Sequence, residues 1–287
     1  MCRDSHLIMR SIRVPISIGK FKVLDESGKT VGECDSVLVP RDLFPNAIWM
    51  NDGRYYRSKK INYEGRIVAV QALDDRTDHY TIAMPNTQLK CDEGVAKLRS
   101  SAGCLVGRGV VTVTRDVRLY KEVPFASEAK ESETVKATKT RPIEYDSTAF
   151  WLDIPRDKLI VWGVKPDKAR ASLHALEHAI RSVFPIVADV DPNDLGSTLE
   201  VTDPNDRQFK CRLYLFDTFA GGTGLSEFAF EKPRLLLDAA EELLSTCKCK
   251  TVEGCPRCSI VAWCEYRNEE LFKPGALKLL NGMRDLR

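Results

Sequence analysis

The stretch Cys247-Lys-Cys-Lys-Thr-Val-Glu-Gly-Cys-Pro-Arg-Cys258 decides how this sequence is organised. Two residues between Cys255 and Cys258 are the knuckle spacing that lets two thiolates face one tetrahedral Zn²⁺ ion. Gly254, directly before this pair, permits the tight turn that the knuckle needs. Because four thiolates fill the coordination shell and leave no position for a water molecule, the pattern predicts a structural zinc ion rather than a catalytic one.

The placement of the cysteines favours a metal over disulfides. Of the 10 cysteines, half lie between Cys247 and Cys264, and the others are scattered. The start of the chain, Met1–His6, is charged and leads into no long apolar core, so it does not predict a secretory signal. Disulfides need an oxidising compartment, and in a reducing one a tight cluster indicates a metal more often. Free buried thiols, redox use and an iron–sulfur cluster are the alternatives, and the spacing leaves open which four of the five cysteines bind.

The composition is that of a globular protein. Of 287 residues, 43% are hydrophobic and 29% are charged, and the formal net charge is +2. No apolar run approaches the roughly 20 residues of a membrane span. The first half of the chain carries a net positive charge and the second half a net negative one. These properties exclude a disordered, fibrous or membrane-spanning chain and predict one large domain or two ordinary ones.

Alternating apolar residues predict a β-rich first part. Asn51-Asp-Gly53, between Ala47–Met50 and Arg54–Arg57, is typical of a hairpin turn. Further strands are expected at Ile16–Leu24, Arg66–Val70 and Gly109–Val123. Strands at this spacing favour a small barrel or a curled sheet. We therefore expect a β-rich module at 1–130, followed by a polar linker at 131–149.

The second part mixes helical and strand patterns. Helices are expected at Ala169–Val183 and at Pro274–Met283. Between them, a helical stretch that begins at Leu225 is interrupted by Pro233, so two helices in tandem are expected, the second of which ends near Ser245. Strands are expected at Leu159–Trp162 and Arg212–Phe216. The predicted fold class is therefore α+β, in which a mixed α/β module at 150–287 ends in the cysteine zinc knuckle.

Basic and aromatic side chains interleave in the second strand of the hairpin. Rings that stack on bases and cations that meet phosphates are typical of a face that binds single-stranded nucleic acid. Because side chains alternate along a strand, Arg54 and Tyr56 should share one face, and Tyr55 and Arg57 the other, so that one tyrosine is left for the core. The alternative is an edge strand protected by its charges. The candidate DNA-binding residues are Arg54, Tyr55, Tyr56, Arg57, Lys59 and Lys60.

A glycine-rich junction lies between a strand pattern and a helix pattern. It consists of Gly221, Gly222, Thr223 and Gly224. Backbone N–H groups at a helix start attract anions, so these residues are a candidate site for a nucleic-acid phosphate. No Walker lysine follows them, which excludes a nucleotide-binding P-loop. The alternative is a tight strand-to-helix turn in which only glycine fits.

His174-Ala-Leu-Glu177-His178 matches the H-x-x-E-H pattern of inverted zincins. In that pattern two histidines on one helical face bind zinc, and the glutamate is the general base. The alternative is a helix with two histidines one turn apart that form ordinary hydrogen bonds. Because five-residue patterns arise by chance, we expect no peptidase activity and treat a zinc metallopeptidase as a rival function.

Three motifs occur together and in order: Leu173–Ile180, Leu215–Leu225 and the cysteine cluster Cys247–Cys258. They resemble the C-terminal region of RecQ-related superfamily-two DNA helicases of the Hrq and mitomycin-repair (Mrf) type, which carries an Mrf zinc-binding domain. The resemblance is strong over 150–287. It extends more weakly over 12–123, through Gly28–Glu33 and Phe44–Met50.

The resemblance implies ATP-driven 3′-to-5′ DNA unwinding, with roles in crosslink repair and genome maintenance. The sequence nevertheless lacks a G-x-x-x-x-G-K-[ST] motif, and Asp92-Glu-Gly-Val95 is not a helicase D-E-x-H box. Both motor domains are therefore absent, and the chain alone should hydrolyse no ATP. The family pattern implies that one zinc ion is held by Cys247, Cys249, Cys255 and Cys258, with Cys264 as a substitute for one of the first pair.

These inferences together predict an accessory region of a DNA repair helicase that closes the strand channel and positions single-stranded DNA. Its expected partners are single-stranded DNA and helicase motor domains in cis or in trans, with no membrane partner. The tail Phe272–Leu277 looks more like the eukaryotic, fungal-type members than the bacterial ones. The expected location is intracellular and nuclear. The rivals are the metallopeptidase and a protein-interaction module without DNA contact.

Overall fold

The computed structural model describes residues 19–73, 77–91, 94, 96–125, 134–261, 264 and 266–286. The expected α+β fold class is confirmed, with large β-sheets, helices and a C-terminal cysteine cluster. The chain forms two compact units: the first unit comprises Met1–Leu89 and Val113–Tyr145, and the second unit Lys90–Thr112 and Asp146–Arg287. Residues 16–18 of the expected first strand, and residues 92, 93 and 95 of the motif that lacks a helicase box, lie outside the described residues.

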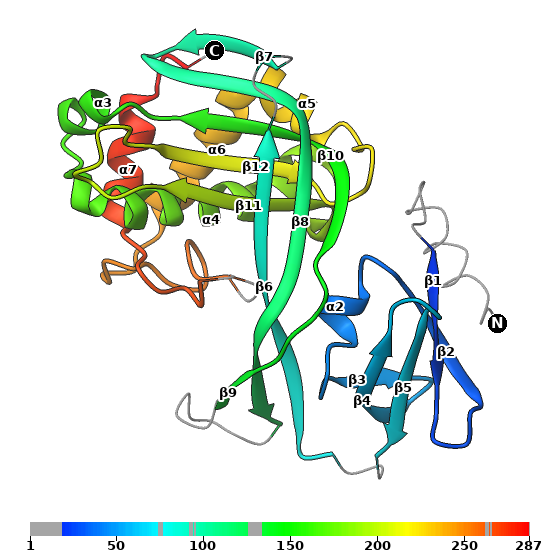
Figure 1. Ribbon diagram of the computed structural model, residues 1–287. Helices are drawn as coiled ribbons and strands as arrows, with labels where there is room; N and C mark the ends of the chain where they lie inside the picture. Colours follow the sequence, from blue (N-terminus) through cyan, green and yellow to red (C-terminus); the bar gives the residue numbers. More distant parts are fainter. Residues whose placement is uncertain are drawn as a thin grey trace. The chain divides into compact units, whose positions relative to one another are not determined.

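The first unit contains a five-stranded sheet in the order β2-β1-β5-β4-β3 (Figure 1). Its strands are β1 (Lys20–Leu24), β2 (Thr30–Asp35), β3 (Ile48–Asn51), β4 (Arg54–Asn62) and β5 (Ile67–Ala72). β1 and β5 run parallel, whereas the other neighbours are antiparallel. In the part of the chain that the structure describes, β2 and β3 are the two edges, so this is an open sheet rather than a closed barrel.

The hairpin of β3 and β4 forms at the predicted turn. Asn51 pairs with Arg54, and the two residues between them, Asp52 and Gly53, have φ angles of 49° and 75°. Positive φ at both central positions is the type I′ turn, whose twist matches that of the flanking strands. The short helix α2 (Val39–Asp42) adds apolar residues to the core of this sheet, which consists mainly of Phe21, Val23, Val39, Leu43, Val68 and Val70.

A second sheet has seven strands, in the order β11-β12-β10-β8-β6, with β7 and β9 also pairing with β8. Its strands are β6 (His79–Cys91), β7 (Lys97–Ser101), β8 (Cys104–Pro124), β9 (Thr134–Ala137), β10 (Ile143–Asp153), β11 (Leu195–Val201) and β12 (Cys211–Asp217). The long strands β6, β8 and β10 contribute residues to both units. β12 lies between β10 and β11, and every one of its residues is buried.

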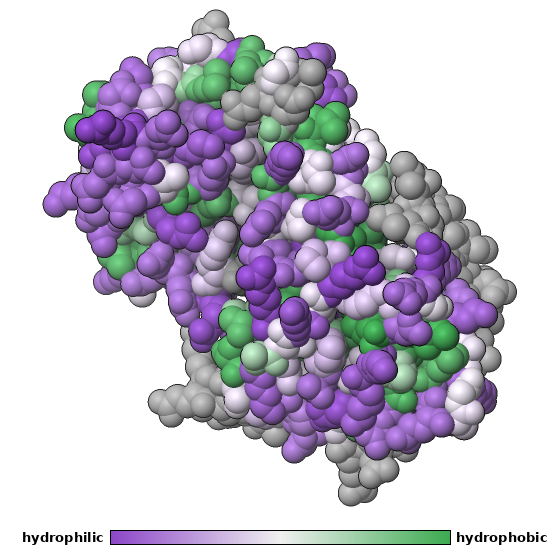
Figure 2. Space-filling view, in the orientation of Figure 1, coloured by the Kyte–Doolittle hydropathy of each residue, from purple (hydrophilic) through white to green (hydrophobic). Residues whose placement is uncertain are grey.

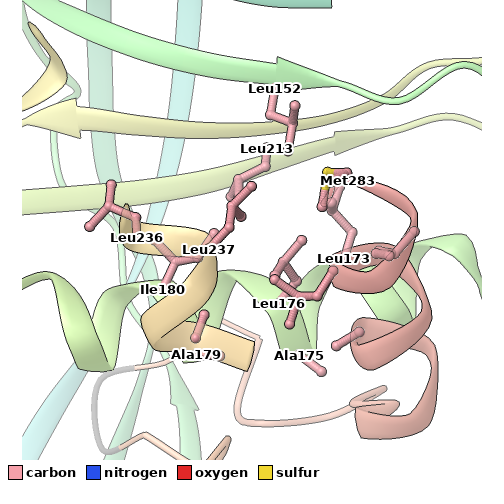
Figure 3. Close-up of a cluster of buried hydrophobic side chains, with 14 of the residues drawn as sticks. Leu152, Leu173, Ala175, Leu176, Ala179, Ile180, Leu213, Leu236, Leu237 and Met283 are labelled. Carbon is pink, nitrogen blue, oxygen red and sulfur yellow. The ribbon is translucent and has the colours of Figure 1, made fainter. Parts of the chain in front are cut away.

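Helices cover one face of strands β10 to β12 in the second unit (Figure 1). They are α4 (Ala169–Ala188), α5 (Leu225–Glu231), α6 (Pro233–Thr246) and α7 (Lys273–Gly282), which lie where the sequence predicts them. Leu173, Leu176 and Ile180 of α4 meet Leu213 of β12 and Leu152 of β10 in one apolar cluster (Figure 3). Among the described residues, no helix is both long enough and apolar enough to cross a membrane.

Two segments differ from expectation. The run Leu159–Trp162, predicted as a strand, falls largely in helix α3 (Arg156–Val161). A run this short has no decisive period, and Asp157 in the first helical turn favours the helix through the helix dipole. The segment 131–149, expected as a linker, contains β9 and the first part of β10. All four residues of β9 are exposed, so its polar composition is compatible with a strand.

Candidate metal centre and nucleic-acid interface

The four cysteines of the predicted knuckle converge in the second unit. Cys247 directly follows α6, and all four Sγ atoms lie within 4.8 Å of one another. The Sγ–Sγ distances are 3.5 Å from Cys247 to Cys255, 3.7 Å from Cys249 to Cys258, and 3.9 Å from Cys255 to Cys258. Tetrahedral zinc with bonds of about 2.3 Å separates its sulfur ligands by about 3.8 Å. The donor set therefore fits one zinc ion in a closed, structural site.

The backbone of the knuckle is built for this convergence. The N–H groups of Cys258 and Ser259 donate to the carbonyl oxygen of Cys255 at 2.9 and 3.0 Å, and the Cys255 N–H donates to Cys258 Sγ at 3.3 Å. Gly254 has a φ of 91°, and a Cβ atom there would lie 1.7 Å from Ser259 Oγ. Only glycine fits such a position, as the sequence predicts for this turn.

Lys273, at the start of α7, is a neighbour of the cluster that the sequence did not identify. Its Nζ atom donates to Cys249 Sγ at 3.3 Å and to the Cys247 carbonyl oxygen at 3.1 Å, and the residue is buried. Burial opposes the charge, but the hydrogen bond to Cys249 and the nearby sulfurs outweigh it and raise the pKa of Lys273. A zinc ion with four thiolates carries a net negative charge, so this ammonium group stabilises the occupied centre.

The thiols of the cluster differ in acidity. The N–H group of Cys249 and the neighbouring thiol of Cys255 lower the pKa of Cys247 to about 7. Burial raises the pKa of Cys249 to about 11. Because zinc binds thiolates, Cys247 is nearer to its metal-binding form at neutral pH than Cys249, whose proton is released to solvent when the ion binds.

Cys264, the substitute ligand expected from the family pattern, lies elsewhere. It is grouped with His174 and His178 of α4, and His174 Nε2 is 3.2 Å from its Sγ atom. Burial lowers the pKa of each histidine to about 4 and raises the pKa of Cys264 to about 11. Both imidazoles are therefore neutral near pH 7.

Glu177, the general base of the rival peptidase, is enclosed. The residue is buried, its carboxylate accepts a hydrogen bond from Ser197 Oγ, and its Oε2 atom is 3.8 Å from His178 Nε2. The adjoining cavity, lined by Glu177 and His178 among others, has a volume of about 10 Å³. A larger pocket of about 330 Å³ is lined by His174 but not by Glu177. The space beside the carboxylate thus admits about one water molecule and no peptide.

The glycine-rich junction binds an internal anion, which corrects the expectation of a phosphate site. The N–H groups of Gly224 and Ser226 each donate to the carboxylate of Asp217 at 2.8 Å, and those of Thr223 and Leu225 also point to it. Asp217 ends β12 and is fully buried. The donors that would meet a phosphate are already occupied, so the junction is the tight strand-to-helix turn.

The candidate DNA-binding residues lie on β4 in different surroundings. Tyr56 is buried in the core of the first unit, where the centroid of its ring lies 5.9 Å from that of Trp49. Tyr55 is half-buried. Arg57 lies 3.9 Å from Glu122 in an ion pair. Of the two tyrosines, therefore, only Tyr55 is at the surface, where it can contact a ligand.

A bulge in β4 exposes its two lysines together. The register to β5 shifts between Ser58 and Lys60, so Lys59 is the extra residue. Strict alternation would turn Lys59 and Lys60 to opposite faces, but in the structure both are exposed, as is Arg54. Three cations of the predicted set are therefore accessible to solvent.

Comparison with known proteins relates these features to one family. The model of the MrfA Zn-binding domain matches residues 176–259, which include all four clustered cysteines. The uncharacterised protein MJ1572.1 of Methanocaldococcus jannaschii is 33% identical over 109 residues, which are 38% of this chain and 96% of that protein. The chain thus contains a region that matches the MrfA Zn-binding domain, and it is related to MJ1572.1 over nearly the whole length of that protein. The expected zinc cofactor is thereby confirmed, by the family and by a cluster that can hold one ion.

Similarity to ATP-dependent helicases extends over most of the chain. The ATP-dependent helicase hrq1 of Schizosaccharomyces pombe is 27% identical over 248 residues, which are 83% of this chain and 23% of that protein. The uncharacterised ATP-dependent helicase YprA of Bacillus subtilis is 23% identical over 235 residues, 80% of this chain and 29% of that protein. The chain corresponds to the C-terminal region of such helicases and spans about a quarter of their length.

The fold is also that of a solved relative. The DUF1998 helicase MrfA, in a crystal structure bound to DNA, aligns with a TM-score of 0.59 over 93% of this chain and 34% of that protein, at 20% identity. The resemblance inferred from the three motifs is therefore confirmed, and the MrfA Zn-binding domain lies in the second unit.

Proposed function

We propose that this chain is the accessory, DNA-handling region of an ATP-dependent 3′-to-5′ DNA helicase. In this role it positions single-stranded DNA and contributes no motor, while the motor domains act in cis or in trans. Similarity to ATP-dependent helicases over 80–83% of the chain supports the proposal, as does a fold shared with MrfA, which was crystallised with DNA. The zinc ion has a structural role, and the biological setting is DNA repair in the nucleus.

An exposed group of aromatic rings beside β4 is the observation that carries this proposal. The ring of Phe125 lies 6.5 Å from that of Tyr55 and 5.3 Å from that of Tyr80, measured between centroids. Phe125 is 54% exposed and Tyr80 37%. Exposed rings in a cluster offer surfaces on which unpaired bases stack, at about 1–3 kcal/mol per base. Tyr80 and Phe125 join the candidate set, although they are distant from β4 in the sequence.

A basic face on the same unit supplies the phosphate contacts. Lys60 pairs with Ala69 of β5, which pairs in turn with Leu24 of β1, so these residues share a sheet face. Lys20 and Lys22 alternate with Leu24 and are exposed on that face. On the side drawn in Figure 2, hydrophilic side chains surround the hydrophobic patches over the strands β1 to β5. Such cations attract a phosphate backbone without regard to base sequence.

The proposal is tested by fluorescence anisotropy of the full chain with labelled single-stranded oligonucleotides at low salt. We expect weak, sequence-tolerant binding that the charge reversal K59E/K60E reduces for all sequences alike. The matched control is K165E/K168E, which makes the same charge change at exposed lysines of the second unit. No binding by the wild type, or an equal loss in both variants, contradicts the proposal and favours the protein-interaction module.

A further inference from the structure

A second group of metal-ligating side chains lies in the second unit, apart from the four cysteines. His174 and His178 are one turn apart on α4 and buried, and Cys264 is half-buried. One ligand atom from each lies within 4.8 Å of the other two, and His174 Nε2 is 3.2 Å from Cys264 Sγ. In a tetrahedral zinc site, nitrogen and sulfur ligands lie about 3.5 Å apart. The three atoms are therefore spaced as ligands of one ion.

Both histidines are oriented as metal ligands are. His178 Nδ1 is 2.6 Å from the carbonyl oxygen of Ser259, which leaves Nε2 as the ring nitrogen that is available to a metal ion. The imidazole of His174 hydrogen-bonds to backbone groups of Glu269 and Glu270, while its Nε2 faces Cys264. A ligating histidine nearly always donates its other ring N–H to a carbonyl or carboxylate, which fixes the ring. Here the chain around the knuckle supplies these acceptors.

The surroundings of these three residues provide space for a fourth metal ligand and a negative charge that can balance the ion. A cavity of about 10 Å³, large enough for about one water molecule, is lined by Glu177, His178, Arg181, Ser197, Cys264 and Tyr266. The buried carboxylate of Glu177 lies 3.8 Å from His178 Nε2, and its ion-pair contact with Arg181 is long, at 4.0 Å. A divalent ion with one thiolate and two neutral imidazoles carries a net charge of about +1, which a buried carboxylate compensates.

We propose that His174, His178 and Cys264 bind a second Zn²⁺ ion, with a water molecule in the adjoining cavity as the fourth ligand. Nitrogen and sulfur donors in this number select zinc over calcium or magnesium. The ion connects α4 to the segment that follows the knuckle and so stabilises that segment. The site is independent of the DNA-binding proposal. His174 and Cys264 lie outside the range 176–259 that the MrfA Zn-binding domain model matches.

Metal counting and cobalt spectroscopy test the site on the full chain. The purified protein is reloaded with Co²⁺, and bound metal is measured by mass spectrometry together with the thiolate-to-cobalt absorption. We expect two ions per wild-type chain and one in Cys264→Ser, with a loss of about a fifth of the thiolate absorption, since one of five Co–S bonds disappears. Cys91→Ser, which removes a half-buried thiol outside both clusters, is the matched control and should keep both ions.

His174→Gln is the second variant, and it keeps all five thiols. It should bind one ion and retain about four fifths or more of the thiolate absorption, with an unchanged far-ultraviolet circular dichroism spectrum. If the circular dichroism spectrum shows that Cys264→Ser is misfolded, the metal content of His174→Gln tests the proposal instead. A single ion in the wild type while all four knuckle thiols are ligated, or two ions in a folded Cys264→Ser or His174→Gln chain, overturns the proposal.

Discussion

His174 Nε2 lies 3.2 Å from Cys264 Sγ, although 90 positions separate the two residues in the sequence. This contact turns the fifth cysteine of the C-terminal cluster toward helix α4. The other four thiols form a complete tetrahedral set without it. The cysteines of this region therefore belong to two groups with different partners, sulfur in one and imidazole in the other.

The four-cysteine centre should hold the C-terminal part of the second unit together. Cys258 is 2% exposed, and its sulfur accepts the Cys255 N–H, so Cys258→Ser removes a zinc ligand and a buried contact at once. We expect the variant to lose the zinc ion of this centre and to melt at a lower temperature, because metal binding stabilises a loop-rich segment. Metal analysis and thermal unfolding, with Cys91→Ser as the control, check this. An unchanged metal content with an unchanged melting temperature would contradict it.

Lys273 should raise the zinc affinity of the same centre. Lys273→Met removes the ammonium group that donates to Cys249 Sγ but keeps a side chain of similar length. Partners that contact metal ligands typically contribute about 10–100-fold in affinity, so we expect zinc to be lost at a correspondingly lower chelator concentration. Lys250→Met, at an exposed lysine between the two cysteine pairs, is the control and should behave as wild type. Equal zinc retention by both variants would show that the Lys273 contact has no effect.

Glu177 should be structural and not catalytic. We expect no peptidase activity, because the space beside its carboxylate is about 10 Å³, and no ATPase activity, because the sequence has no phosphate-binding loop. Glu177→Gln keeps an acceptor for Ser197 and should lower the free energy of unfolding by about 1 kcal/mol. Peptide-cleavage and ATPase assays with denaturant unfolding measure these outcomes. Zinc-dependent cleavage by the wild type that disappears in Glu177→Gln would favour the metallopeptidase instead.

Asp217 should be a principal stabilising residue of the second unit. Its buried carboxylate accepts N–H groups from the turn Thr223–Ser226. Hydrogen bonds to a charged acceptor are worth about 1.5–3 kcal/mol, so Asp217→Asn should lower the free energy of unfolding by about 2–3 kcal/mol. Asp206→Asn is the control, since that exposed carboxylate accepts the Gln208 N–H on a surface turn. Similar unfolding curves for the two variants would refute this role of the carboxylate.

Local patterns predicted much of this fold. Helices α4 to α7 follow from apolar spacing and from Pro233, and the β3–β4 hairpin follows from Asn51-Asp-Gly53, because each signal lies within the element itself. Strand β9 could not be predicted in this way. It is exposed and polar, and its strand conformation depends on pairing with β8, as in the pair Leu119 and Ala137.

The candidate sites show the same difference between signals that are local in the sequence and contacts that depend on tertiary packing. The knuckle cysteines are close in the sequence, so their spacing already indicates a shared ion. The contacts of Lys273 with Cys249 and of His174 with Cys264 depend on how α7 and α4 pack, and no local pattern reports that. The glycine-rich junction predicted backbone N–H groups that bind an anion, and it has them. The anion, however, is the side chain of Asp217 and not a phosphate.

Single-stranded DNA binding through β4 is the central claim, and the salt dependence of that binding tests it most directly. Each phosphate that a lysine neutralises on a single strand contributes about −0.7 to the slope of log K against log salt concentration. The slope measured by anisotropy for K59A/K60A should therefore be shallower than that of the wild type by about 1.4, whereas K165A/K168A should leave it unchanged. Equal slopes for the wild type and K59A/K60A, or no binding by the wild type at low salt, would contradict the claim.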